Sequence, residues 1–543
     1  MRGADLLMRS LAECGVEICF ANPGTSEMHL VAALDAAPGI RPVLTLQENV
    51  ASGAADGWGR MMGRPASTLL HLGSGLSNAL SNLQNARRAA TPIVNIVGDH
   101  ASYHLANDPP LASDIAALAG VMSAWVHTVP SALQGAAAAV AAVDAANGPP
   151  GAIATLIVPA DVAWSQVDEA DAATAWQATR TPGNSRLGAS LPNDASVRAS
   201  AGRRSSTNGA DGAVVERVAR ALASGESAVI LVGGRALRDV ELADAARVAA
   251  ATGARLACPT FTARARRGAG SVSVERLPYF PELVAQWFAG VRHLILVDAP
   301  LPVAFFAYPG QSTALLPADC AVHTLATGAD DIPAVLDALV TATGASRVEV
   351  PRVPLAPMGL PSGPLTPLAV AQTVAALLPA EAIVCDEAIT NRFPCLAATV
   401  GALPHDWCCL TGGSLGMGMP LSLGAALAAP GRRVLNLQAD GSAMYAPQAL
   451  WSFAREGVDV TTVMLVNRRY RVLDVELQRL QLTGLVRGQS LTDLAVPPID
   501  YVQLARSMGV PASRVDSAEG LARAMSRAFA EPGPQVVEAV MVE

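Results

Sequence analysis

The sequence predicts an α/β protein built from three doubly wound parallel-sheet units, and three observations lead to this class. The chain has 543 residues, which is long enough for three or more domains. Hydrophobic residues make up 51% of it and charged residues only 15%, so a large buried core is expected. Short apolar runs alternate with Ala-rich stretches of helical length, and two stretches without such periodicity divide the chain.

The first unit fits this class because its apolar runs are continuous rather than alternating with polar residues. Parallel strands that helices cover on both faces have this pattern. The expected strands lie at 17–21, 43–46, 67–70, 93–97 and 153–159. The helices expected between them lie at 26–36, 49–62 and 77–89.

Two segments separate the units. Residues 171–212 are largely polar and Gly-rich, and residues 346–366 are Pro-rich, so both are predicted to be linkers. The domains are therefore predicted at 1–170, 213–345 and 367–543. Further strands are expected at 228–232, 255–258 and 293–297 in the second unit, and at 383–385, 434–438, 460–466 and 535–540 in the third.

Composition excludes several functional classes. Lys and Arg number 38 against 46 Asp and Glu, which gives a formal charge of −8, and no unit is basic, so nucleic acid is not an expected partner. No apolar run reaches the length of a membrane span. The chain starts without an apolar secretory leader, and its eight cysteines have neither zinc-type nor disulfide-type spacing. We expect a cytoplasmic protein with reduced thiols.

A carboxylate and an amide follow neighbouring strands of the third unit. Asp440 comes directly after the run 434–438, and Asn467 directly after the run 460–466. The carboxyl ends of parallel strands meet at one edge of the sheet, where ligands bind in such folds. Oxygen ligands suit Mg²⁺, and the amides of Gly441 and Ser442, which open the next helix, favour an anion. The third unit is thus predicted to hold a metal–diphosphate.

The segment from Asp440 to Asn467 resembles the thiamine diphosphate signature, which reads Gly-Asp-Gly and then, about two dozen residues later, Asn-Asn. The two positions that depart from it are Ala439 and Val466. The resemblance implies that Asp440, Asn467 and the backbone carbonyl of Arg469 bind Mg²⁺. It also implies that Gly441, Ser442 and Tyr470 contact the cofactor.

A Gly-rich segment, 411–420, resembles the loop of the same family that leads into a helix beneath the cofactor. The resemblance implies that Leu415 supports the bent cofactor and that the carbonyl of Gly413 accepts a hydrogen bond from its aminopyrimidine. The segment 386–391 resembles the one that contacts the diphosphate, which assigns Thr390 and Asn391 to that contact.

Glu48 begins a helix of small residues after the run 43–46. A glutamate there often only complements the helix dipole. The segment 47–57, however, resembles the pyrimidine-binding segment of the thiamine diphosphate family, in which a buried glutamate shares a proton with the pyrimidine ring. The resemblance assigns that role to Glu48, and the first and third units become the pyrimidine-binding and diphosphate-binding domains.

Other residues of the first unit border the predicted substrate site. The loop 22–27, which contains Thr25, closely resembles the substrate-side loop of benzoylformate decarboxylase and its acetolactate synthase-like relatives. His71 aligns with the active-site histidine of benzoylformate decarboxylase, and histidine is the side chain best suited to proton transfer near neutral pH. His100 and His104 follow the run 93–97, and we consider them as further catalytic candidates. The alternative for each histidine is a structural role.

The family resemblance extends over nearly the whole chain and implies an enzyme of the acetolactate synthase-like and benzoylformate decarboxylase-like group. The expected reaction is decarboxylation of a 2-oxo acid, carboligation of its product, or both. Val472 and Leu473 predict an apolar substrate pocket. A homodimer or homotetramer is implied, since in the family Glu48 would meet the metal–diphosphate of another subunit. The central unit leaves FAD binding open, because Gly233-Gly234-Arg235 does not discriminate.

Two alternatives remain at this point. The cluster of Arg264, Arg266 and Arg267 could bind a nucleotide, which would suit a CoA-linked 2-hydroxyacyl lyase. The departures at Ala439 and Val466 would suit a cofactor-binding but inactive paralogue that acts as a partner subunit.

Overall fold

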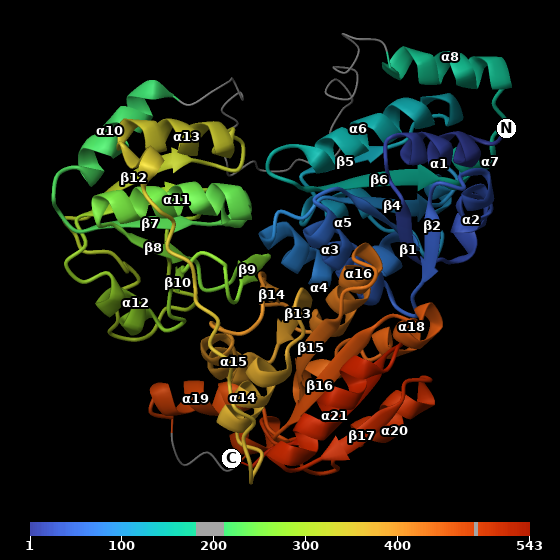
Figure 1. The fold of residues 1–543 in the computed structure, drawn as a ribbon. Helices are drawn as coiled ribbons and strands as arrows, with labels where there is room; N and C mark the ends of the chain where they lie inside the picture. The colour runs from blue at the N-terminus through green and yellow to red at the C-terminus, as the bar shows by residue number, and fades with distance from the viewer. Residues whose placement is uncertain (181–210, 483–486, 543) are drawn as a thin grey trace.

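The computed structural model describes residues 1–180, 211–482 and 487–542 and contains three mainly parallel β-sheets flanked by helices (Figure 1). The predicted α/β class with three doubly wound units is confirmed. The sheets lie in three lobes, and a long segment without helix or strand, 348–366, runs down the molecule from the central lobe to the C-terminal one. No helix in the described part of the chain is both long and apolar enough to cross a membrane.

The first sheet has six parallel strands in the order β2-β1-β3-β4-β6-β5. The strands are β1 (Ile18–Asn22), β2 (Arg41–Leu44), β3 (Ala66–Leu70), β4 (Ile93–Asp99), β5 (Trp125–Thr128) and β6 (Ile153–Pro159). Helices α1 (Gly3–Glu13) and α6 (Gly135–Asn147) cover one face, and α3 (Glu48–Met62) and α4 (Leu72–Arg88) cover the other. The carboxyl ends of β2, β1, β3 and β4 are neighbours, as the continuous apolar runs predict.

The central sheet has five parallel strands in the order β10-β8-β7-β11-β12. They are β7 (Ala228–Val232), β8 (Arg255–Cys258), β10 (Glu275–Arg276), β11 (His293–Val297) and β12 (Ala321–Ala326). Helices α10 (Gly212–Leu222), α11 (Asp239–Thr252) and α13 (Ile332–Ala342) pack on one face, and α12 (Pro281–Trp287) packs on the other.

The third sheet contains seven strands in the order β17-β18-β16-β15-β13-β14-β9. They are β9 (Ala265–Arg267), β13 (Ala382–Glu387), β14 (His405–Cys409), β15 (Val434–Ala439), β16 (Val460–Val466), β17 (Ala512–Val515) and β18 (Gln535–Val540). Helices α14 (Pro367–Leu377) and α21 (Ala518–Ala530) cover one face. The opposite face packs against α16 (Gly418–Ala428), α18 (Ala449–Glu456) and α20 (Tyr501–Ser507).

Two structural features differ from the sequence expectation. Strand β9 belongs to the segment assigned to the central unit, yet it pairs antiparallel with β14 and extends the third sheet. Residues 171–180, assigned to the first linker, lie in helix α8 (Glu169–Arg180), and residues 181–210 of that linker lie outside the described residues.

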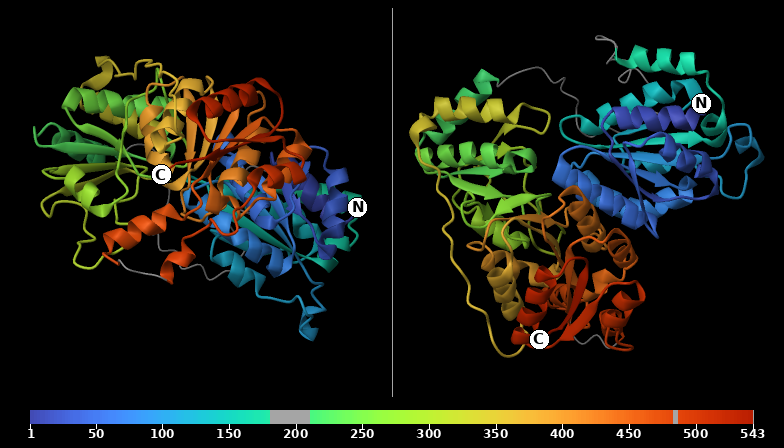
Figure 2. Two further views of the ribbon diagram at one scale, coloured as in Figure 1. Left: turned by 90° about the horizontal axis from the view of Figure 1, so that it is seen from below. Right: turned by 45° about the vertical axis from the view of Figure 1, so that its right-hand side comes forward.

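The first and third lobes share one apolar core, in which helices α3 and α16 pack against each other. Figure 2 shows the blue first lobe beside the orange part of the third lobe. A methyl group at Gly424 would lie 1.8 Å from the carbonyl oxygen of Ala54, and one at Gly57 would lie 2.1 Å from that of Leu421. Glycine at these positions therefore permits the close approach of the two helices. The contact brings the N-terminal turn of α3 beside the Gly-rich loop that precedes α16.

Candidate active site

Glu48 lies at the carboxyl edge of the first sheet, as the first residue of α3, and is only 6% exposed. Its two carboxylate oxygens accept hydrogen bonds from side-chain amides, Asn22 Nδ2 at 3.1 Å and Asn78 Nδ2 at 3.1 Å. The expected burial is present, although the immediate neighbours are amides and Leu46 is 45% exposed. Both oxygens of this buried carboxylate therefore have neutral amide donors.

His71 follows β3 at the same edge and is oriented by a glutamate that the sequence analysis did not single out. Its Nδ1 lies 2.8 Å from Glu27 Oε2 and 3.1 Å from Ser26 Oγ. Glu27 is fully buried, and the backbone N–H of Gly24 also donates to its Oε2 at 2.8 Å. Gly98 leaves room for this carboxylate, because a Cβ there would lie 2.0 Å from Glu27 Oε1. Glu27 and Ser26 therefore hold the His71 ring through its Nδ1.

The other candidates of the first unit lie farther out along this edge. Thr25 begins the short turn before Glu27 and is exposed. His100 follows β4, and its ring packs edge-on against that of His104 at 5.8 Å. The Nε2 of His100 is buried and has no hydrogen-bond partner among the described residues, whereas His104 is exposed. Glu27 and His71 are thus in direct contact, whereas the ring of His104 contacts His100.

At the carboxyl edge of the third sheet, Asp440 and Asn467 lie side by side. The carboxylate of Asp440 accepts hydrogen bonds from the backbone amides of Gly441 at 2.9 Å, Asn467 at 3.1 Å and Arg468 at 2.6 Å. Arg468 takes a left-handed conformation, with φ of 58°, so that its amide can turn toward the carboxylate. Burial raises the pKa of Asp440, which is 4% exposed and has no cationic partner among the described residues.

The donor set at this edge is oxygen-rich. It combines the Asp440 carboxylate with the Asn467 side-chain oxygen, which accepts from the Arg469 amide at 3.1 Å. No cluster of three or more His, Cys, Asp or Glu able to bind a metal occurs in the described residues. One carboxylate with neutral oxygens leaves positions for water and phosphate, which suits Mg²⁺.

The Gly-rich loop between β14 and α16 is fixed from beneath by a second buried acid. The backbone amides of Gly416 and Gly418 each donate to Glu387 at 2.6 Å, and Gln438 Nε2 donates to it at 3.1 Å. Glu387 is fully buried at the end of β13, and burial raises its pKa. Above this contact Gly413 has φ of 71° and Leu415 is half-buried. These hydrogen bonds to Glu387 fix the backbone of the loop.

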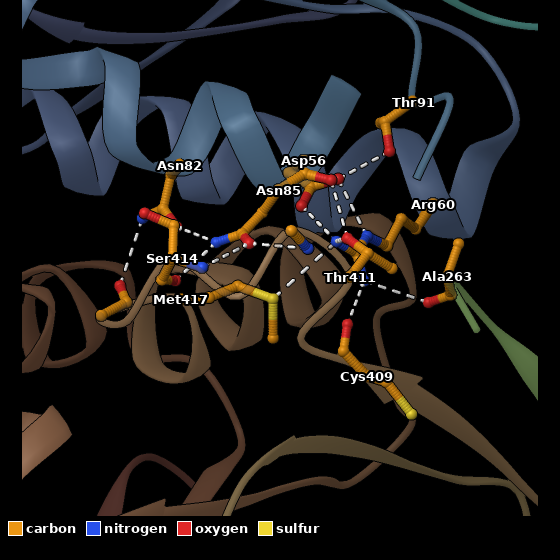
Figure 3. A network of polar contacts seen from close by, with 12 residues as sticks. Asp56, Arg60, Asn82, Asn85, Thr91, Ala263, Cys409, Thr411, Ser414 and Met417 are labelled. Carbon is orange, nitrogen blue, oxygen red and sulfur yellow. Dashed lines mark hydrogen bonds and ion pairs between the residues drawn. The ribbon is translucent and has the colours of Figure 1, made fainter. Parts of the chain in front are cut away.

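The first lobe also holds this loop, through polar side chains of α3 and α4 (Figure 3). Asn85 accepts hydrogen bonds from the amides of Gly412 and Ser414 and donates to the Ser414 carbonyl at 2.8 Å. Arg60 forms a fully buried ion pair with Asp56 at 2.6 Å. The same guanidinium reaches all three lobes, because it also donates to the Cys409 carbonyl, the Ala263 carbonyl, the Thr411 hydroxyl and the Met417 sulfur.

Comparison with known proteins agrees with this geometry. Residues 1–118 match the thiamine pyrophosphate enzyme N-terminal TPP binding domain, and residues 399–539 match the corresponding C-terminal TPP binding domain. The whole chain is 47% identical over 552 residues to the candidate acetolactate synthase large subunit IlvX of Mycobacterium tuberculosis, and the alignment covers 99% of that protein. The chain belongs to the thiamine pyrophosphate enzyme family. Thiamine pyrophosphate, or thiamine diphosphate, is therefore its cofactor.

Other members of the thiamine pyrophosphate enzyme family match over nearly the full length. Benzoylformate decarboxylase of Pseudomonas aeruginosa is 27% identical over 550 residues, with 96% of each chain covered. The solved structure of a 4-hydroxybenzoylformate decarboxylase from Rhodococcus jostii superposes with a TM-score of 0.81 at 23% identity and covers 100% of this chain and 99% of the other. That structure has the same fold. The chain is a thiamine diphosphate-dependent enzyme related to acetolactate synthase and to benzoylformate decarboxylase.

Within this family the remaining candidates have clear positions. Gly441 packs under the ring of Tyr470, since a Cβ there would lie 2.3 Å from the Tyr470 ring. Ser442 accepts from Gln438 Nε2 at 2.7 Å. Thr390 and Asn391 form the 3₁₀ turn η8 (Ile389–Asn391) after β13, at the same edge as Asp440.

The residues predicted to line the substrate pocket lie in the first turn of α19 (Arg471–Arg479). Val472 is half-buried and Leu473 is 46% exposed. This helix directly follows the Asn467–Tyr470 turn and packs against η8. The position assigned from the resemblance is thus next to the metal–diphosphate edge.

Several functional contacts were beyond sequence reasoning. The hydrogen-bond partners of three such residues lie far away in the chain. The residues are Glu27, Asn85 and Glu387, and the bond from Asn85 to Ser414 spans 329 residues. A glutamate three residues after Gly24 at the start of a helical turn was the one local signal available for Glu27.

Proposed function

We propose that the chain decarboxylates a 2-oxo acid with thiamine diphosphate and Mg²⁺, with release or carboligation of the product. The observation that carries the proposal is the pairing of Asp440 and Asn467 at the carboxyl ends of β15 and β16. Both are fixed by backbone hydrogen bonds, and their oxygens suit Mg²⁺. The similarity to benzoylformate decarboxylase and to an acetolactate synthase large subunit supports the choice of a 2-oxo acid.

Thiamine diphosphate, when bound, supplies a nucleophilic carbon that adds to a carbonyl and an electron sink for the bond that is broken. Asp440, Asn467 and the Arg469 carbonyl would hold Mg²⁺, and Gly441, Ser442, Thr390, Asn391 and Tyr470 would contact the diphosphate side. Gly413 and Leu415 would orient the cofactor from the Gly-rich loop.

The proton-handling groups belong to the first lobe. Glu48 is buried between two amide donors and would share a proton with the aminopyrimidine. His71 would deliver or remove a proton at the substrate through Nε2, while Glu27 and Ser26 fix its ring through Nδ1. Thr25 and His100 would border the substrate, and His104 would lie outside this group.

We propose a homo-oligomer, at least a dimer, in which Glu48 of one copy meets the metal–diphosphate edge of another. Exposed apolar residues at both edges support this arrangement. Leu46, two residues before Glu48, is 45% exposed, and Met444 and Tyr445, just after Ser442, are 42% and 52% exposed. Apolar side chains grouped around a site are typical of contact surfaces.

The CoA-linked alternative loses its main support. Arg264 pairs with Asp406 and donates to the Met61 carbonyl, and Arg266 pairs with Glu381. Arg267 donates to the Leu396 carbonyl at 2.6 Å. These arginines are committed to internal contacts and do not form an open nucleotide site.

The test begins with calorimetric titration of the cofactor-free protein with thiamine diphosphate and Mg²⁺, for the wild type and Asp440→Ala. Tight, metal-dependent binding that the substitution abolishes supports the site, and a screen of 2-oxo acids for CO₂ release and product structure then tests the reaction. Binding without CO₂ release from any 2-oxo acid would favour the inactive paralogue, in which Ala439 and Val466 mark lost activity.

A further inference from the structure

Helix α19 joins the cofactor side of the third lobe to the central lobe. Its first turn carries Val472 and Leu473, and its later turns carry Glu476 and Arg479. Tyr308 donates a hydrogen bond from its hydroxyl to Glu476 Oε2 at 2.9 Å. Arg479 forms a two-pronged ion pair with Glu282, in which Nη2 lies 2.9 Å from Oε2. These contacts use one oxygen of Glu476 and the two terminal nitrogens of Arg479.

The remaining polar atoms of this pair have no partner. Glu476 Oε1 and Arg479 Nε are both buried and lack a hydrogen bond within the described residues. They do not satisfy each other, because Arg479 Nε lies 3.8 Å from Glu476 Oε2, beyond hydrogen-bond distance. A buried donor and a buried acceptor both need hydrogen-bond partners, so the two atoms are available to a further polar group.

Tyr308 cannot supply that group. Burial, together with its hydrogen bond to Glu476, raises the pKa of Tyr308, so the hydroxyl keeps its proton and remains a donor to Oε2. Glu476 Oε1 is therefore the acceptor left for a ligand.

The chemistry of the two atoms selects the ligand group. A hydroxyl donates one hydrogen bond and accepts another, so it satisfies Glu476 Oε1 and Arg479 Nε together. The guanidinium of Arg479 would repel an ammonium group. The carboxylate of Glu476 would repel a carboxylate. A single hydroxyl, from water or from a ligand, is the group that fits both.

An aromatic cluster lies beside this polar pair. The rings of Tyr279 and Phe305 stack at 5.0 Å and 20°, and Phe261 packs edge-on against Phe305 at 5.2 Å. Arg479 lies over the ring of Phe280 at 4.0 Å, and Arg392 lies over Phe261 at 4.8 Å. Phe305 is 48% exposed, so a planar aromatic ligand can make stacking or edge contacts with its ring.

This cluster is continuous with the proposed active site. Arg392 begins the helix that follows η8, the turn assigned to the diphosphate. Glu476 lies four residues after Val472 on the same helix, which places it about 6 Å farther along the axis. A ligand whose reactive end lies at the first turn of α19 would reach Glu476 with a group on the far side of one aromatic ring.

We propose that Glu476 and Arg479 form a specificity site for the hydroxyl group of an aryl 2-oxo acid, with Glu476 as acceptor and Arg479 as donor. The inference rests on the proposed function, because it places the substrate's reactive carbonyl at the cofactor. It predicts that the enzyme prefers substrates with a hydroxyl at the far end of the ring over those without one.

The experiment uses the protein loaded with thiamine diphosphate and Mg²⁺ and two readouts. Calorimetry measures binding of 4-hydroxymandelate and mandelate, which lack the reactive carbonyl. Turnover is measured with benzoylformate, phenylpyruvate and their 4-hydroxy forms, which differ in the distance from carbonyl to hydroxyl. A hydrogen bond to a charged group predicts a preference of about ten- to one-hundredfold for the hydroxylated compounds.

Two variants separate recognition from structure. Glu476→Gln keeps an acceptor for Tyr308 but presents an N–H where the substrate hydroxyl donates, so the preference should fall to a few-fold at most. Tyr308→Phe removes the hydrogen bond from the central lobe to Glu476 and keeps the Glu476 side chain, so the preference should persist. Equal loss in both variants would show that Glu476 acts only as an interdomain contact, which overturns the proposal.

The remaining outcomes are also decisive. Equal binding of mandelate and 4-hydroxymandelate by the wild type would show that the two atoms bind water alone, and the proposal would be wrong. If the binding preference is present and Glu476→Gln removes it, but no 2-oxo acid is turned over, the hydroxyl site stands and the proposed reaction fails. Turnover without any hydroxyl preference supports the reaction and rejects the specificity site.

Discussion

The carboxyl edges of the first and third sheets are built from the same kind of parallel strands, yet they hold their acids in different ways. In the first sheet, side chains hold side chains, as amides of Asn22 and Asn78 bind Glu48 and His71 binds Glu27. In the third sheet, three backbone amides hold Asp440. Side-chain partners can change rotamer, whereas backbone amides fix a carboxylate in place. This difference agrees with the proposed division, in which the first edge handles protons and the other edge binds the cofactor.

The strongest test of this separation is Glu48→Gln. We expect kcat to fall about 10²- to 10⁴-fold, the usual contribution of a positioned proton-transfer group, because an amide cannot share a proton with the aminopyrimidine. Affinity for thiamine diphosphate should change by no more than a few-fold. Steady-state turnover and calorimetry measure the two quantities, and Glu17→Gln, a surface acid of the same lobe, should change neither. A variant that loses affinity and turnover equally would contradict the separation.

Asp440→Ala tests the opposite edge. Loss of a partner of a metal ligand commonly costs about 10- to 100-fold in affinity, and loss of the ligand itself should cost at least the upper end of that range. Calorimetric titration with Mg²⁺ and thiamine diphosphate gives the value. Asp459, which precedes β16 at the opposite edge of the same sheet, provides the control, and Asp459→Ala should bind normally. Unchanged binding by Asp440→Ala would remove Asp440 from the site.

His405, at the amino edge of the third sheet, should affect the pH dependence of folding stability without affecting cofactor binding. Burial lowers the pKa of His405, the first residue of β14, from its usual value near 6.5 to about 4. Below pH 6.5 the unfolded chain binds a proton at this residue that the folded chain does not, so stability falls as the pH drops from 6.5 to about 4. The loss is roughly 3 kcal/mol.

Urea unfolding at several pH values measures this loss, and His405→Gln should show a smaller decline toward acid. Its affinity for the cofactor at pH 7 should equal that of the wild type. The same acid sensitivity in wild type and variant would assign the decline to other groups.

The smallest effect on stability is expected from a substitution at the contact between the first and third lobes. Asn85→Ala removes the side-chain hydrogen bonds to Gly412 and Ser414, which should cost about 2 kcal/mol of stability. Cofactor affinity should fall more than in the surface variant Asn107→Ala, since the Gly-rich loop loses its support. Chemical denaturation and calorimetry measure both. Reduced stability with unchanged affinity would show that the loop keeps its shape without the first lobe.

Much of this arrangement could be predicted from local sequence. The runs 434–438 and 460–466 are apolar because both faces of their sheet are buried, and their ends therefore locate Asp440 and Asn467. Strand β14, His405–Cys409, was missed because it is short and combines His, Asp and Trp with Cys rather than β-branched residues.

The rest depends on contacts between distant segments. Strand β9 belongs to the third sheet only because it pairs with β14, about 140 residues later, and nothing in Ala265–Arg267 indicates that partner. Glu27, Asn85 and Glu476 are ordinary polar residues in sequence. Their roles arise from the specific atoms that folding places within 3 Å or so of them.

The crossing of α3 and α16 has a consequence for how the molecule can deform. At Gly57 and Gly424 the backbones of the two helices are in contact, and no side chain lies between them that could change its rotamer. The first and third lobes therefore behave as one stiff body at that point. We expect flexing to be easier between the central lobe and α19, where the contacts run through long side chains such as Arg479 and Tyr308.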